Sequence, residues 1–331
     1  MNIKHEGTKN IVMVKLAALI LTLSALFCCL PAAPAAEGSS SFIRWVDCNI
    51  PYEVLLSAYE YEVKYHNTEV EFDFVKALAY LAVKCGNKFR PQRDIKALSD
   101  LVLSLIQGKK IDDYFGGDKY YKYYVEAYGA IFAEFIGDYV TESGEVGYGL
   151  KNYHPFPKGY WYTHYDDFGA SRSFGFKRKH LGHDLLGSIG TPIAAVEGGI
   201  VTEFGWNRYG GWRIGIRSFD KKRSYYYAHL RKNKPYIEGL KKGDTVAAGQ
   251  IIGYLGVTGY SLKENSNMSG KPHLHLGMQL IFDESQYQGP SEIWIDLYDI
   301  CKFLSHNRAE VYKEGSDYKS KNLKISLSRQ D

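Results

Sequence analysis

A group of histidines and one aspartate has the residue types and the spacing of a metal site. His180 and Asp184 lie four positions apart, and His273 and His275 lie two positions apart. In a β-strand, side chains two or four positions apart point to one face, so each pair can face one cleft, whereas His183 would point away. Two histidines and one aspartate leave a fourth tetrahedral position open, as in catalytic zinc sites. We therefore predict that His180, Asp184 and His275 bind one zinc ion.

The sequence around and between these motifs indicates a known family. Glycine-rich and apolar segments follow one another in a fixed order, at residues 190–201, 209–212, 227–230, 243–253 and 256–261. From about residue 160 to 283 the chain resembles the lysostaphin-like (LytM-type) zinc endopeptidases, which cut peptidoglycan peptides. The resemblance implies His180, Asp184 and His275 as the metal ligands. It also implies that His273 and His229 are the catalytic histidines that do not bind the metal.

The predicted chemistry is hydrolysis of a peptide bond by a metal-bound water. Zinc lowers the pKa of its water and polarises the scissile carbonyl. His273 would accept the proton of this water, and His229 would hydrogen-bond the oxyanion or pass a proton to the leaving amine. The sequence contains no His-Glu-x-x-His motif, so it does not support a glutamate-based mechanism.

A second function class remains open beside the enzyme. Export-associated relatives of this family have lost ligands and serve as non-catalytic scaffolds or regulators of the cell envelope. The complete set of histidines and aspartate favours the enzyme, because so many convergent groups indicate an active site. Peptidoglycan is the predicted partner in either case. The sequence does not decide between glycine cross-bridges and stem peptides with D-amino acids as the bond that is cut.

Charge and the first residues predict the location of the protein. The net charge is +4, and Lys4, Lys9 and Lys15 against Glu6 account for half of it. The rest of the chain is nearly balanced, which argues against a nucleic-acid partner. Lysines, an apolar run and small residues such as Ala33-Pro34-Ala35 are typical of a cleaved export signal, although the apolar run is long enough for a membrane anchor. We expect an exported protein, either extracellular and wall-associated or anchored facing outward.

Three cysteines remain beyond the export segment. They are Cys48, Cys85 and Cys301. An exported protein with so few cysteines is not a disulfide scaffold, but a bridge between Cys48 and Cys85 is possible. None of the three has metal-ligand spacing, so buried free thiols are the simpler interpretation.

The rest of the chain predicts an α+β protein. Residues 42–140 show helical periodicity for four helices, one of which would begin at a capping box from Thr68 to Glu71. Short apolar runs between turn residues then predict an antiparallel sheet. Ser291 is a natural N-cap for a last helix. His154 and His164 have no partner at ligand spacing, which is typical of surface or hydrogen-bonding histidines.

These patterns divide the chain into five parts. The architecture would be an N-terminal helical bundle, an antiparallel β-sheet-rich lysostaphin-like (duplicated hybrid motif) peptidase domain and a C-terminal helix. The predicted parts are residues 1–36 for the export signal or anchor, 42–140 for the helical domain, 141–159 for a linker, 160–285 for the zinc metallopeptidase domain, and 286–331 for the C-terminal helix and polar tail. The 331 residues are long enough for two domains.

Overall fold

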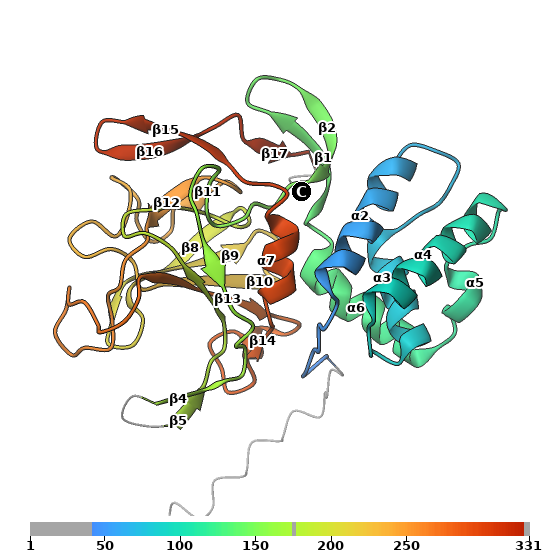
Figure 1. Ribbon diagram of the computed structural model, residues 1–331, viewed down its shortest axis with the longest axis horizontal. Coiled ribbons are helices and arrows are strands. Elements are labelled where there is room, and N and C mark those ends of the chain that lie inside the picture. Colours follow the sequence, from blue (N-terminus) through green and yellow to red (C-terminus); the bar gives the residue numbers. More distant parts are fainter. Residues whose placement is uncertain (1–41, 174–176, 328–331) are drawn as a thin grey trace, which may run out of the picture. The chain divides into compact units, whose positions relative to one another are not determined.

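The computed structural model describes residues 42–173 and 177–327 (Figure 1). The export segment predicted for residues 1–36 lies outside these ranges. Within them, no helix combines the length and the apolar character that a membrane span requires. The described residues from Ile43 onward form one compact unit.

Helices occupy the first part of the described chain, as predicted. They are α2 (Tyr52–Tyr65), α3 (Phe74–Cys85), α4 (Pro91–Ile106), the short α5 (Asp112–Phe115) and α6 (Lys119–Phe132). The predicted capping box at Thr68 is wrong, because Asp73 is the N-cap of α3 and its carboxylate accepts a hydrogen bond from the Lys76 backbone N–H. Residues 66–73 form a turn instead. At the other end of α3, Gly86 has a φ of 60°, the left-handed conformation that terminates many helices.

The segment predicted as a linker is folded, so that prediction is wrong. β1 (Ile136–Thr141) and β2 (Val146–Leu150) form an antiparallel pair, and residues 149–157 are buried. The glycines that resemble a linker serve strand packing here, because a side chain at Gly147 would collide with the ring of Tyr139. The described part of the chain therefore has no extended connection between its helices and its main sheet. Independent folding of residues 42–140 stays a prediction.

The main sheet is antiparallel throughout, which confirms the predicted α+β class. Its strand order is β11-β8-β9-β10-β13-β6-β3, and β14 also pairs with β13. The strands are β3 (Thr163–His164), β6 (His183–Leu186), β8 (Gly199–Asn207), β9 (Gly211–Ser218), β10 (Arg223–Ala228), β11 (Thr245–Val246), β13 (His273–Leu280) and β14 (Ile293–Trp294). Two further pairs are β7 (Pro192–Ala194) with β12 (Ile251–Tyr254), and β4 (Ser171–Ser173) with β5 (Lys177–Lys179).

The alternation of side chains along β13 places its two histidines on the face of the strand opposite the core. Leu274, Leu276 and Met278 are buried in the core. Because successive side chains of a strand point to opposite faces, His273 and His275 face away from that core. The predicted common face of these two histidines is thus confirmed.

The C-terminal part differs from the prediction. The last helix, α7 (Tyr298–Leu304), begins after Ser291, and its first turn is capped by Asp296, whose carboxylate accepts from the Tyr298 backbone N–H. The residues after Ser291 form β14 instead, because they pair with β13. The predicted polar tail is largely exposed, but it is folded: it forms β15 (Glu310–Glu314), β16 (Asp317–Lys321) and β17 (Lys324–Ser326), and β17 pairs with β1.

A buried ion-pair network joins the helices to the sheet. Arg223 at the start of β10 is fully buried and forms two hydrogen bonds to Glu197, of 2.8 and 3.0 Å. The same guanidinium donates to the backbone oxygen of Ala130 in α6 over 2.6 Å. In addition, Phe303 of α7 packs against Phe74 of α3, with ring centroids 6.1 Å apart. Helices and sheet therefore share one hydrophobic core.

Candidate metal centre

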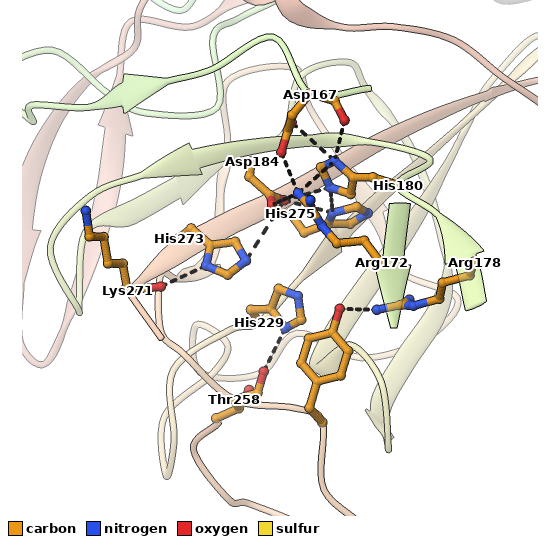
Figure 2. A network of polar contacts seen from close by, with 11 residues as sticks. Asp167, Arg172, Arg178, His180, Asp184, His229, Thr258, Lys271, His273 and His275 are labelled. Atoms are coloured by element: carbon orange, nitrogen blue, oxygen red, sulfur yellow. Dashed lines mark hydrogen bonds and ion pairs between the residues drawn. The ribbon is translucent and has the colours of Figure 1, made fainter. Parts of the chain in front are cut away.

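Two adjacent strands and the segment before them bring the predicted ligands together. Asp184 on β6 lies directly opposite His275 on β13. His180 precedes β6, and its backbone N–H donates to the oxygen of Ala170 over 2.9 Å. His180 lies beside Asp184 as expected, but strand parity does not explain this, because His180 lies outside the strand. Figure 2 shows the side chains of all three ligand candidates converging.

The three candidate ligand atoms form a nearly equilateral triangle. His180 Nε2, Asp184 Oδ1 and His275 Nδ1 lie 3.0 Å from one another. Three mutual hydrogen bonds cannot explain this arrangement, because each imidazole nitrogen carries at most one hydrogen and the ionised carboxylate carries none. A tetrahedral zinc ion with bonds of about 2.0–2.1 Å would separate its ligands by about 3.3 Å, close to the observed spacing. This donor set fits zinc, and it is the one such group among the described residues.

Burial and neighbouring charges shift the pKa values of all three candidate ligands. Burial would raise the pKa of Asp184, but hydrogen bonds with His180 and His275 outweigh burial and place this pKa well below its ordinary value. Burial lowers the pKa of His275, with Asp184 opposing. Burial would also lower the pKa of His180, yet Asp184 and Asp167 leave it raised. The carboxylate is thus ionised and available as a ligand.

Two further histidines face the same site with defined tautomers. His273 Nδ1 lies 2.8 Å from the backbone oxygen of Lys271, and its Nε2 lies 3.9 Å from Asp184 Oδ1. His229 Nδ1 lies 2.7 Å from the backbone oxygen of Thr258. Since a carbonyl oxygen only accepts, each Nδ1 carries a hydrogen, and in the neutral form of either ring Nε2 has the lone pair. The two rings are 4.7 Å apart.

His229 adopts a backbone conformation that favours glycine. Its φ is 62°, directly after the end of β10, and its backbone N–H donates to Gly210 over 2.7 Å. Such strain in a non-glycine residue is typical of functional sites, where the surrounding structure over-determines it. Burial, together with the neighbouring histidines, lowers the pKa of His229 to about 3, so the ring is neutral near pH 7.

The histidines predicted to lie outside the site do so. His183 points away from the ligands, and its Nε2 lies 2.7 Å from His164 Nδ1. Burial and His164 lower the pKa of His183 to about 3. His154 is buried rather than on the surface, and its Nδ1 accepts from the Phe156 backbone N–H over 3.0 Å. These three are hydrogen-bonding histidines of the fold.

Sequence reasoning missed the charged residues around the ligands. Asp167 lies beside His180 Nδ1, with Oδ1 at 3.2 Å and the backbone oxygen at 3.3 Å. Arg172 pairs with Asp167 and approaches Asp184 Oδ2 to 3.5 Å. Ligating histidines commonly direct their second nitrogen to a carboxylate or carbonyl, which fixes the ring. The only signal in the sequence was their position shortly before His180.

The ligands and both catalytic candidates line one cavity of about 590 Å³. Aromatic side chains form much of its wall, including Tyr209, Tyr226, Tyr260 and Trp294. A cleft of this size with a few convergent polar groups is typical of a site for a small molecule or peptide.

Comparison with known proteins agrees with this geometry. Residues 178–288 match the model of peptidase family M23. The chain is 40% identical over 126 residues to the L-Ala--D-Glu endopeptidase of Bacillus subtilis, covering 38% of this chain and 36% of that protein. It is 38% identical over 143 residues to lysostaphin of Staphylococcus simulans, covering 43% and 24%. The chain thus spans about a third of one relative's length and a quarter of the other's.

A solved structure supports the fold over a larger part of the chain. A Ruminococcus gnavus protein assigned as a glycyl-glycine endopeptidase LytM aligns with a TM-score of 0.53 and 22% identity, covering 83% of this chain and 94% of that one. The likeness shows the mixed α+β fold. The family match, the curated relatives and the predicted lysostaphin-like resemblance agree, and we conclude that residues 178–288 of this chain form a peptidase family M23 domain.

Proposed function

We propose that this protein is a zinc-dependent endopeptidase that hydrolyses peptide bonds in peptidoglycan. The observation that carries the proposal is the triangle of His180 Nε2, Asp184 Oδ1 and His275 Nδ1, beside two histidines whose Nε2 lone pairs are free. The names of the relatives supply the substrate class, since they include endopeptidases and a peptidoglycan DD-endopeptidase of Vibrio cholerae.

His180, Asp184 and His275 would bind the zinc ion. A bound zinc ion supplies a water of lowered pKa and polarises the scissile carbonyl. Asp167 orients the ring of His180 by facing its Nδ1, so that Nε2 points to the other two ligands. In this proposal Asp167 is a positioning residue.

His273 would act as the general base. Its Nδ1–H donates to the Lys271 carbonyl, which leaves Nε2 to accept a proton, and Nε2 lies 3.9 Å from a ligand oxygen. Proton transfer by a positioned histidine typically contributes 10²- to 10⁴-fold to the rate.

His229 would accept and return a proton rather than bind the oxyanion in its resting state. Its Nδ1–H donates to the Thr258 carbonyl, so neutral His229 presents no N–H to the cleft. Only after it takes up a proton at Nε2 does it become a donor toward the leaving amine. Of the two roles expected from the sequence, this tautomer supports the proton shuttle.

We further propose that the protein acts outside the cell, as the predicted export segment at residues 1–36 indicates. The alternative function is a wall-binding scaffold, which would bind the same material without cutting it.

The test is digestion of purified wall material by the zinc-loaded protein, with mass analysis of the released peptides. We expect new amino termini from the wild type and almost none from His273→Ala. His306→Ala removes an exposed histidine that hydrogen-bonds Tyr52 and should behave as the wild type. Wall binding without any released peptide would refute the enzyme and support the scaffold.

A further inference from the structure

Among the described residues, two cations in the cavity wall have no acidic partner, the exposed Lys179 and the half-buried Arg178. Arg172 pairs with Asp167, and Arg213 pairs with Glu203. Arg178 on β5 lines the same cavity. Within the part of the chain that the structure describes, its polar contact is the hydroxyl of Tyr260, and its Nε is shielded from solvent without a hydrogen-bond partner.

Aromatic rings hold the Arg178 guanidinium in position. Its centre lies 5.0 Å from the ring centroid of Tyr260 and 5.7 Å from that of Tyr209. The loops carrying these tyrosines are joined by a hydrogen bond of 3.2 Å from the Tyr260 backbone N–H to the Tyr209 oxygen. Cation–π contacts offset part of the desolvation cost of the guanidinium, but they do not replace hydrogen bonds, and the buried Nε–H has no acceptor.

Arg178 lies one ring away from a catalytic candidate. The ring of Tyr260 stacks on His229, with centroids 5.6 Å apart and an interplanar angle of 26°. Figure 2 shows Arg178 and Lys271 on either side of His229. A substrate group that contacts Arg178 would therefore lie close to the reacting bond.

We propose that Arg178 binds a free carboxylate of the substrate, close to the scissile bond. Guanidinium groups match carboxylates with paired, charge-assisted hydrogen bonds, and Arg178 has donors to spare. The site would then select acidic peptides, such as those with a D-Glu residue, over uncharged glycine bridges. This inference rests on the proposed peptidase function and names its substrate class.

The test compares two synthetic peptides that differ in a single group. One contains an L-Ala–D-Glu bond with the free α-carboxylate, and the other carries the corresponding amide. For the wild type we expect kcat/KM to be roughly 10- to 100-fold higher for the carboxylate peptide, as charge-assisted hydrogen bonds allow, mainly through KM. Arg178→Gln should bring the ratio close to one, and Arg178→Lys should restore part of it.

Lys177→Gln is the matched control. Lys177 is an exposed cation on the same strand that does not line the cavity, so its variant should keep the wild-type ratio. If Arg178 had a purely structural role and only held β5 against Tyr260, Arg178→Gln would lower kcat/KM equally for both peptides. Equal loss, or a ratio near one in the wild type, would overturn the proposal.

A binding measurement separates this proposal from the proposed function. Calorimetry of both peptides with the zinc-loaded His273→Ala protein reports recognition without turnover. The carboxylate peptide should bind more tightly than the amide peptide, and this difference should disappear in the His273→Ala, Arg178→Gln double variant. That result supports the carboxylate site even if no peptide is cut. If the wild type digests wall material but both peptides bind equally well, the carboxylate site is refuted and the peptidase function is not.

Discussion

Replacing Glu197 by glutamine should destabilise the fold strongly, because it leaves a buried cation short of its main partner. Glu197 is 7% exposed and accepts two hydrogen bonds from fully buried Arg223 and one from Tyr225, of 2.8 Å. Glu197→Gln keeps the shape and removes the charge. Arg223 then retains one carboxylate, Asp220 at 2.8 Å.

The magnitude follows from the burial of the pair. Breaking a buried ion pair by removing one partner typically costs 3–5 kcal/mol. Since Asp220 remains, we expect the lower end, about 3 kcal/mol. At roughly 2–3 °C per kcal/mol for a chain of this size, the melting temperature should fall by roughly 6–9 °C.

Glu284→Gln provides the control for this measurement. Glu284 also accepts two hydrogen bonds from one arginine, Arg217, at 2.6 and 2.8 Å, but its side chain is 70% exposed. An exposed pair contributes little, so the loss should stay below about 1 kcal/mol. Urea unfolding followed by circular dichroism measures both variants. Equal effects of the two substitutions would show that the buried network does not stabilise the junction between α6 and the sheet.

The remaining predictions concern the site. Asp184→Ala should remove zinc from the purified protein, measured by metal analysis, because two histidines alone bind it weakly. His273→Ala should retain about one zinc per chain yet lose about 10²- to 10⁴-fold in kcat. If this variant lost its metal, His273 would be a zinc ligand and not the general base. Asp167→Asn should weaken zinc affinity about 10- to 100-fold in a chelator competition, whereas unchanged affinity would exclude an orienting role. Only neutral histidine binds metal, and the pKa of His180 is raised. Zinc affinity should therefore fall on acidification, and the fall should begin at a higher pH than it would for a histidine of ordinary pKa.

The sequence predicted which histidines and aspartate come together at the site, but it did not predict the charged residues around them. The alternation of His273 and His275 on β13 follows from strand geometry, which acts over two residues. His180 was grouped with Asp184 for a reason that the structure only partly supports, because the chain outside β6 is irregular there and pairs with Ala170 instead.

Other features depend on contacts distant in sequence. Gly147 resembles a linker residue until the ring of Tyr139 packs against it from the paired strand. Ser291 is a suitable N-cap, but pairing with β13 extends the following residues and delays the helix. The possible bridge between Cys48 and Cys85 is absent, since both are free thiols in the structure. Local patterns cannot report such partners, because tertiary packing overrides them.

The central claim is that His180, Asp184 and His275 bind one zinc ion. Anomalous scattering at the zinc edge from crystals of the zinc-loaded protein tests it most directly. The account predicts one strong peak within about 2.0–2.2 Å of His180 Nε2, Asp184 Oδ1 and His275 Nδ1. A peak bonded to other side chains, or none at full zinc loading, would contradict it.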